Sequence, residues 1–340
     1  MGKKIVIIGS GHVGSHVARA LAYTEWAGDI VLVDTDMNKA IAQAADVADS
    51  LSFSAMESAF YHKQGEDKEC FDFSENVVRA GELKEYLDAD IVVVSVGMPR
   101  KPGQKRLDML DDSAIMLKKM TEDMKAEALK IYPGLKGKEA FAKAFKGIVI
   151  TITNPADIVA DYVRTSLGME RFRCFGTGTL LDTFRIYRAL SESTGVKRSD
   201  IEAYVFGEHG DSSTAPKSLI KIKGNPEFDI DDVMKKTHEG GDVIIHGKGS
   251  TEFGIGQALA FLAKQVVYDT GIVLPLSVHL MGEYGFDDVN CGVPCRVGKD
   301  GISEIIEMPL KENERELLAA SIDVIRKHTE RAFEIAPIGE

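Results

Sequence analysis

A single histidine, His209, lies between two glycines and two carboxylates in the segment 207–211, which reads GEHGD. The residues just before it, 204–206, are apolar, and the glycines permit tight backbone turns. A histidine in this setting can be held facing a cavity, where its imidazole can give and take a proton near neutral pH. The same pattern also suits a solvated turn, so the interpretation depends on what the rest of the chain supplies.

A glycine-rich turn near the N-terminus is typical of dinucleotide binding. The apolar run 3–8 leads directly into the sequence GSGHVG at 9–14, and a helical pattern follows. A helix N-terminus offers free N–H groups and a positive dipole end to a pyrophosphate, and glycine lets the phosphates approach the backbone. The residues predicted to contact the cofactor here are Gly9, Gly11, His12, Val13 and Gly14.

The next apolar run, at 30–33, ends in Asp34. A carboxylate at the tip of the second strand can accept both ribose hydroxyls of an adenosine, and it repels a 2′-phosphate. The sequence therefore predicts NAD, and not NADP, as the cofactor.

Further apolar runs at 91–96 and 148–152 alternate with helical patterns at about 37–52 and 111–131. Unbroken apolar strands that alternate with helices indicate a parallel sheet covered on both faces. We therefore predict an α/β fold, with a Rossmann-type doubly wound NAD-binding domain over residues 1–153. The polar stretches 62–75 and 134–147 are interpreted as surface insertions without a motif.

The second half of the chain, residues 154–340, is predicted to form a catalytic domain of mixed α+β character. Its patterns indicate helices at 155–167, 180–194, 251–271 and 312–334, strands at 289–297 and 301–308, and a turn at 298–301 between those strands.

Composition narrows the classes of partner. The 340 residues carry a net charge of −12, which argues against nucleic acid, and no apolar run approaches the ~18 residues that span a bilayer. The four cysteines are too few and too irregular for a disulfide framework, and no metal site is predicted. We expect a cytoplasmic protein with a small anionic substrate.

An anionic substrate requires local positive charge, and the loop 97–106 after the strand 91–96 supplies it. The loop begins at Gly97, a further predicted cofactor contact, and contains two arginines and two lysines, among them Arg100 and Arg106. Ligands of open parallel sheets bind outside the carboxyl ends of the strands, so this loop is placed to bind substrate. The alternative is a solvated basic loop.

Taken together, these motifs resemble the lactate and malate dehydrogenase family nearly end to end. The match includes the glycine turn, the arginine loop, TNPAD at 153–157, GTGTLLD at 176–182, GEHGD at 207–211 and KGST at 248–251. The resemblance implies an NAD-dependent enzyme that interconverts a 2-hydroxy acid and its 2-oxo acid.

The resemblance also assigns roles. It implies that His209 exchanges a proton with the substrate hydroxyl or carbonyl while hydride passes to or from nicotinamide, and that Asp182 orients the histidine and stabilises the imidazolium. Arg185, which would share a helix face with Asp182, matches the residue that binds the substrate carboxylate through a bidentate pair. Arg106 matches the mobile-loop arginine that polarises the carbonyl, and Asn154 matches an asparagine that borders both nicotinamide and substrate.

The substrate side chain is predicted from Arg100, because arginine at this position resembles malate dehydrogenases whereas lactate dehydrogenases usually carry an amide. Oxaloacetate brings a second carboxylate to pair with it, and pyruvate brings only a methyl group. Against this, Thr251 and the motifs around it resemble the lactate branch, and threonine reduces the room for a longer substrate. We weigh charge above volume and favour malate and oxaloacetate, with L-lactate and pyruvate as the alternative.

Regulation and assembly complete these expectations. Many bacterial lactate dehydrogenases bind fructose 1,6-bisphosphate through an arginine and a histidine, but the matching positions here hold Tyr187 and Glu202, so no activation by this sugar is predicted. The family is dimeric or tetrameric, which implies a homodimer or homotetramer. The functions of another class that stay open are an NAD- and metal-dependent glycoside hydrolase and a non-catalytic dinucleotide-binding protein.

Overall fold

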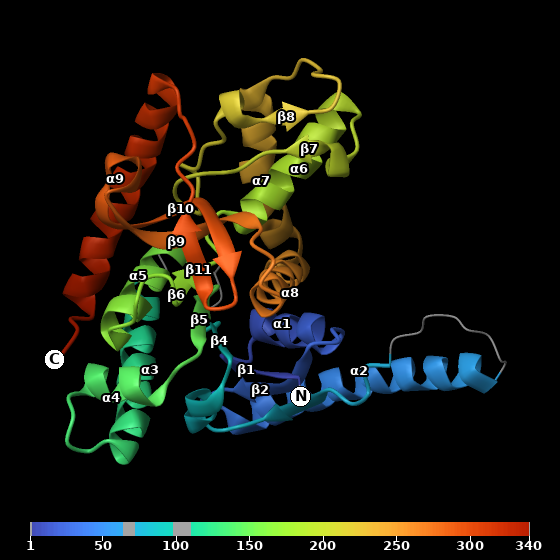
Figure 1. The fold of residues 1–340 in the computed structure, drawn as a ribbon, viewed down its shortest axis with the longest axis vertical. Helices are drawn as coiled ribbons and strands as arrows, with labels where there is room; N and C mark the ends of the chain where they lie inside the picture. Colours follow the sequence, from blue (N-terminus) through green and yellow to red (C-terminus); the bar gives the residue numbers. More distant parts are fainter. Residues whose placement is uncertain (1, 64–71, 98–109, 340) are drawn as a thin grey trace.

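A nine-stranded sheet runs through the centre of the molecule, with helices on both faces (Figure 1). The computed structural model describes residues 2–63, 72–97 and 110–339. Arg100 and Arg106, together with most of the predicted arginine loop, lie outside these residues.

The order of the strands across the sheet is β11-β10-β9-β6-β5-β4-β1-β2-β3. The first six in the chain are parallel, and their order 3-2-1-4-5-6 is that of a doubly wound dinucleotide-binding sheet. Their bounds are β1 Lys3–Ile8, β2 Ala27–Val33, β3 Val77–Ala80, β4 Ile91–Val94, β5 Ile148–Thr151 and β6 Cys174–Gly176. The predicted Rossmann-type α/β fold is confirmed.

The last strands extend the same sheet and do not form a separate one. They are β9 Val273–Met281, β10 Asp287–Gly298 and β11 Gly301–Ile305. All three pair antiparallel, and β9 joins β6 through the pair Gly176 and Ser277. The predicted turn between β10 and β11 is present, and it allows the two strands to pair back on each other.

The helices cover the sheet and build the upper part of the molecule in Figure 1. Their bounds are α1 His12–Ala22, α2 Met37–Lys63, α3 Leu110–Ile131, α4 Gly137–Ala144, α5 Ala156–Leu167, α6 Leu180–Thr194, α7 Ile230–Lys248, α8 Phe253–Val267 and α9 Glu312–Ile335. Short 3-10 turns lie at η1 Leu83–Asp88, η3 Arg198–Asp200, η4 Lys217–Leu219 and η5 Glu283–Gly285. No helix among the described residues is long and apolar enough to cross a membrane.

Two sequence-based expectations about local structure were wrong. The stretch 134–147 is not a surface insertion, because it contains α4, whose Phe141 is buried and stacks on Tyr86 with 5.5 Å between ring centroids. The helix expected to end near 52 continues to Lys63. The sequence reading also missed α7 and the strands β3, β6 and β9, most of which are too short or too polar to give a clear period.

Helices α6 and α7 and the two-stranded sheet of β7 Ile201–Glu202 and β8 Lys221–Ile222 share a small core of their own. Ile186, Leu190, Ala203 and Val205 are fully buried or nearly so within it. This unit includes α6, the helix of Asp182 and Arg185, and Figure 1 shows it above the large sheet.

Helix α1, which follows the glycine-rich turn, packs against the second half of the chain where α8 crosses it. A Cβ atom added at Gly256 of α8 would lie 2.9 Å from the carbonyl oxygen of His16 on α1, so only glycine permits this approach. The ring of His16 also meets the ring of Phe253 edge to face at 4.9 Å. The turn at 249–252, which leads into α8, is thereby held beside the glycine-rich turn.

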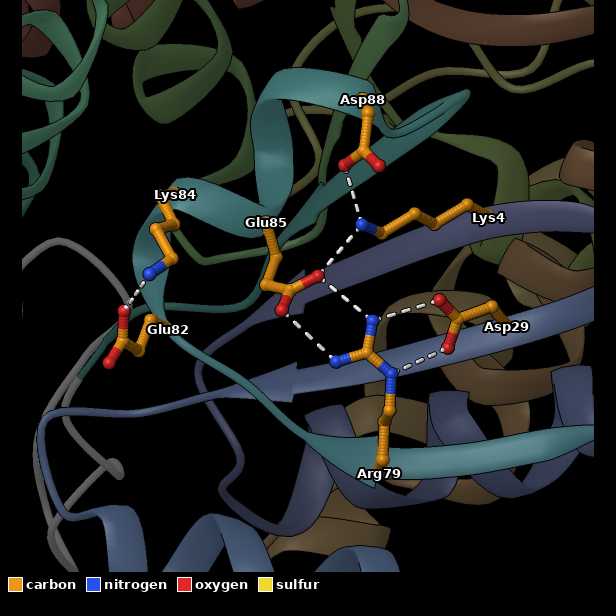
Figure 2. Close-up of polar contacts among 7 residues, drawn as sticks. All are labelled: Lys4, Asp29, Arg79, Glu82, Lys84, Glu85 and Asp88. Atoms are coloured by element: carbon orange, nitrogen blue, oxygen red, sulfur yellow. Dashed lines mark hydrogen bonds and ion pairs between the residues drawn. The ribbon is translucent and has the colours of Figure 1, made fainter. Parts of the chain in front are cut away.

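An ion network ties the strands β1, β2 and β3 to η1 (Figure 2). The guanidinium of Arg79 binds Asp29 on one side, with Nη2 and Oδ2 2.9 Å apart, and Glu85 on the other, with Nη2 and Oε2 2.9 Å apart. Lys4 continues the network from Glu85, at 2.7 Å, to Asp88. Because one planar fork serves two carboxylates, the network fixes the register of strands far apart in the sequence.

Candidate active site

His209 is carried by a loop that is paired with the sheet. The backbone N–H of Gly207 donates to the carbonyl of Gly292 on β10, at 2.9 Å, and Gly207 has a φ of +92°, which favours glycine. On the other side, the backbone N–H of His209 donates to Oδ2 of Asp157 at 2.7 Å. The backbone of this loop is therefore held on one side by β10 and on the other by Asp157, independently of the contacts of the imidazole.

The predicted contact between His209 and Asp182 is present. Nδ1 of His209 lies 2.5 Å from Oδ2 of Asp182, and the other carboxylate oxygen accepts from Nη1 of Arg185 at 2.9 Å. The three side chains are only 11%, 7% and 9% exposed, respectively. Because the carboxylate engages Nδ1, the nitrogen left for proton exchange is Nε2.

Helix α6 explains this arrangement. Asp182 lies in its first turn, where the helix dipole stabilises a carboxylate, and Arg185 follows one turn later on the same face. The expectation that the two residues share a helix face is confirmed.

A cavity of about 460 Å³ opens where this cluster meets the glycine-rich turn. Its walls come from α1, the ends of β4 and β5, α6, α7 and the turn before α8. Eight predicted site residues line it: Gly11, His12, Val13, Gly97, Asn154, Arg185, His209 and Thr251. Gly11 and Thr251, which were predicted from motifs 240 positions apart, therefore line the same cavity.

The three predicted glycines of the glycine-rich turn have different tasks. Gly9 has a φ of +104°, and a Cβ atom at Gly14 would lie 1.9 Å from the carbonyl oxygen of Gly9, so both positions require glycine. At Gly11 a Cβ atom would meet nothing nearer than Nζ of Lys39, at 3.9 Å. Gly9 and Gly14 thus shape the turn, whereas Gly11 leaves the surface of the turn open to a ligand.

Asp34 borders the glycine turn and does not line the cavity itself. Its Oδ2 accepts from the backbone N–H of Ser10, at 2.8 Å, and from the Ser10 hydroxyl, at 2.9 Å. Burial alone would raise the pKa of Asp34, but hydrogen bonds from the N–H groups of Asp36 and Ser10, the Ser10 hydroxyl and the charge of Lys39 hold that pKa below its ordinary value. Asp34 is therefore a carboxylate at neutral pH.

Models of two domains match this chain in sequence. The lactate/malate dehydrogenase NAD-binding domain matches residues 3–176, and the alpha/beta C-terminal domain of the same proteins matches residues 179–336. The chain belongs to the lactate and malate dehydrogenase family. It is an NAD-dependent 2-hydroxy acid dehydrogenase of that family, and the predictions of the family, the enzyme class and the cofactor are confirmed.

Individual members of the family resemble the chain over almost its whole length. It is 34% identical to the L-lactate dehydrogenase of Fusobacterium nucleatum, over 96% of this chain and 96% of that protein. Among solved structures it is similar to the minor L-lactate dehydrogenase of Enterococcus mundtii, with 28% identity, a TM-score of 0.81 and coverage of 97% and 98%. It is also similar to the malate dehydrogenase of Archaeoglobus fulgidus in complex with NADH, with 28% identity, a TM-score of 0.78 and coverage of 97% and 99%.

The cavity of this dehydrogenase fits a dinucleotide. Helix α1 begins after Gly11 without a side-chain cap, so its first N–H groups face the turn uncovered. Oδ1 of Asn154 is buried without a hydrogen-bond partner among the described residues, which is a costly state for an acceptor unless a ligand donates to it. These residues would hold the pyrophosphate and the nicotinamide side of NAD.

The cavity is also lined by residues that were not predicted from the sequence. They are Lys39, Gln43, Ser95, Ile152, Thr153, Ala156, Thr177, Gly178, Leu181, Ile245, Gly249, Ser250 and Ile255. Thr177, Gly178 and Ser250 fall inside motifs that the sequence displays, so their signal was available. Lys39 and Ile245 lie on helices whose facing side is known only from the fold, and no spacing could have indicated them.

Tyr187 and Glu202 lie close to each other on α6 and β7. Burial raises the pKa of Tyr187, and the charge of Glu202 adds to this effect. Glu202 itself is exposed and pairs with Lys221, with 3.1 Å between Oε2 and Nζ. Within the described residues, no group of three or more His, Cys, Asp or Glu side chains could hold a metal ion.

Proposed function

We propose that this dehydrogenase interconverts an L-2-hydroxy acid and its 2-oxo acid, with His209 as the proton donor and acceptor. The observation that carries the proposal is a buried series of hydrogen bonds that runs from Arg185 to Asp182 and on to His209. The imidazole at its end lines the same cavity as the glycine-rich turn. NAD supplies the hydride chemistry when it is bound.

Each of the catalytic residues has one task in this proposal. In reduction, Nε2 of His209 gives its proton to the substrate carbonyl, and in oxidation it takes the proton of the hydroxyl. Asp182 keeps Nδ1 engaged, which fixes the ring and stabilises its positive form. Arg106, by the family resemblance, polarises the carbonyl from the loop.

Arg185 holds the substrate carboxylate. Its Nη1 is occupied by Asp182, but a guanidinium has five N–H donors in a fixed fork, and Arg185 lines the cavity. Asn154 and Thr251, which line the same cavity, complete the substrate side. A substrate carboxylate at Arg185 would place the adjoining 2-carbon beside His209.

For the substrate we favour malate and oxaloacetate, on the charge of Arg100. A second carboxylate pairs with this arginine, whereas pyruvate would leave it without a partner in the closed site. Breaking a buried charge pair costs about 3 to 5 kcal/mol, but a loop arginine can turn to water. We therefore expect about 1 to 3 kcal/mol, roughly a five- to hundredfold preference.

A second candidate, L-lactate and pyruvate, is favoured by a different observation. Thr251 lines the cavity together with Arg185, and a threonine at this position leaves less room for a longer substrate than a smaller residue would. The similar proteins from Lactobacillus helveticus and Fusobacterium nucleatum are named L-lactate dehydrogenases.

The two candidates are separated by NADH oxidation with oxaloacetate and pyruvate in parallel, for the wild type, Arg100→Gln and Lys101→Gln. The lysine variant removes the same charge from the same loop and is the matched control. We expect the oxaloacetate to pyruvate ratio of kcat/KM to fall only in Arg100→Gln. A wild-type preference for pyruvate, or a ratio that Arg100→Gln leaves unchanged, would favour lactate.

The proton-transfer proposal has its own test, His209→Asn. This variant should bind NADH, measured by its fluorescence, and should have almost no turnover with either oxo acid. Substantial turnover in His209→Asn would remove His209 from the mechanism.

We also propose that the enzyme assembles as a homodimer or homotetramer. The support is that large apolar side chains are exposed on α2, α7 and α8, among them Phe53, Met56, Val243 and Phe253, at 69% to 71% exposure. Sedimentation velocity at micromolar concentration should give a species larger than one chain, and a monomer would contradict the proposal.

A further inference from the structure

A second carboxylate, besides Asp182, is held against His209. Asp157 lies in the first turn of α5, and its Oδ2 accepts the backbone N–H of His209 at 2.7 Å. The side chain of Asp182 lies in the first turn of α6 and bonds to the imidazole of the same residue. His209 is therefore held by two carboxylates, each in the first turn of a helix. Asp157 binds its backbone N–H, and Asp182 binds its ring.

Asp157 is an unusual place for a negative charge. The residue is only 2% exposed, and no lysine or arginine among the described residues forms an ion pair with it. The ionisable groups that face it are His209 and Glu208 on the loop and Cys291 on β10. Of these, only the imidazole of His209 can become positive, so the proton on His209 is the charge that compensates Asp157.

Several neighbouring groups influence whether the Asp157 carboxyl is charged. Burial raises the pKa of Asp157 to about 6, while the N–H of His209 and the charge of the His209 ring act in the opposite direction, so Asp157 is mainly a carboxylate at pH 7. The dipole of α5 also favours an anion at this end of the helix.

We propose that Asp157 is a positioning residue for proton transfer: it fixes the backbone of His209, and its negative charge favours the protonated imidazole. The inference rests on the proposed role of His209. It assigns to the last residue of the motif at 153–157 a part in the reaction that the motif itself does not reveal.

The charge effect has a sign that can be measured. Reduction of the oxo acid requires the protonated imidazole, so its rate falls at high pH. Removing the charge of Asp157 destabilises the protonated form, so this fall should move to lower pH. Oxidation requires the neutral imidazole, so its rate on the acidic side should rise. A residue that only supported the fold would slow both directions together.

Asp157→Asn is the first variant, because the amide oxygen can still accept the N–H of His209 while the charge is lost. We expect the fall of the reduction rate to move down by about 0.5 to 1 unit, so that reduction above the fall is roughly three- to tenfold slower, and oxidation should be faster between about pH 6 and the fall, where the wild-type Asp157 is charged. Asp157→Ala also leaves the buried N–H unpaired, and its kcat should fall about tenfold or more in both directions. NADH binding should be unchanged in both variants.

Asp161→Asn is the matched control. Asp161 lies one turn further along α5, is also buried, and pairs with Arg164, at 2.8 Å, and with His279, away from His209. This variant should lower the melting temperature and leave both pH profiles in place. If Asp157→Asn does not fold, the pH profiles of Asp157→Ala test the same charge, because this variant also removes it and should move the profiles in the same direction, in addition to its loss of kcat.

Profiles of Asp157→Asn that coincide with the wild type, or an Asp157→Ala variant without a shift where that test is needed, would overturn the inference. The outcome is separable from the proposed function. If His209→Asn is inactive and the Asp157 variants do not shift the profile, only the inference fails. If His209→Asn is active, the proposed function fails first.

Discussion

Replacing Asp182 by asparagine tests the centre of the proposed mechanism. The change is nearly isosteric, but it removes the charge that faces both His209 and Arg185. An asparagine can also present its NH₂ group to Nδ1 of His209, which would place the ring proton on Nε2 and leave that nitrogen unable to accept one. The variant should therefore retain the shape of the site and lose its chemistry.

The size of the effect follows from the burial of the cluster. The Asp182 and His209 side chains are 7% and 11% exposed, and their contact is 2.5 Å, so water screens the pair little. Removing one partner of a buried pair costs about 3 to 5 kcal/mol. At 1.36 kcal/mol for each factor of ten, this corresponds to a roughly two hundred- to five thousandfold loss of kcat/KM if the pair is fully formed in the transition state.

The assay is NADH oxidation with the preferred oxo acid, together with thermal unfolding. Asp161→Asn is again the control, because Asp161 and Arg164 form a buried pair of the same i,i+3 spacing as Asp182 and Arg185. Both variants should melt at lower temperature, and only Asp182→Asn should lose activity. A loss of less than fivefold in Asp182→Asn, with a folded protein, would refute the reasoning.

Three further predictions concern other parts of the chain. Fructose 1,6-bisphosphate should leave the activity unchanged, because Tyr187 and Glu202 offer it no positive charge; a large rise in rate on adding it would contradict this. Asp34→Ser should raise the KM for NADH about tenfold and improve the use of NADPH, since a 2′-phosphate is no longer repelled, and kinetics with both cofactors measures the change. The hydrogen bond from Arg79, opposed by burial and assisted by Lys4, lowers the pKa of Glu85 to about 2, so its contribution to stability is present above the ordinary pKa of 4.5 and is lost as the pH falls toward 2. Glu85→Gln should therefore cost about 1 kcal/mol in urea unfolding at pH 7, allowing for solvent screening, and clearly less at pH 3. An equal loss at both pH values would argue against the ion network of Figure 2 as its cause.

Local patterns located β1, β2, β4 and β5 because these strands are continuous apolar runs, whereas β3 and β6 are too short to give a clear period. The order of glycine turn, strand and Asp34 predicted NAD binding, and the models of the family agree. The same reasoning failed for the stretch 134–147, where Phe141 stacks on Tyr86, a residue far away in the sequence that no local period connects to it.

By itself, the sequence determined the family, the cofactor and the identities of the chemical groups, since these follow from residue types in a fixed order. Only the tertiary structure decided which groups meet. The contact of His209 with Asp182 depends on the small core that places α6 above the sheet, and the contact of its backbone with Asp157 depends on the start of α5. The motif at 153–157 contains Asp157, but the proposed effect of Asp157 on the proton of His209 comes from its burial beside that imidazole. Burial is a property of the packed fold.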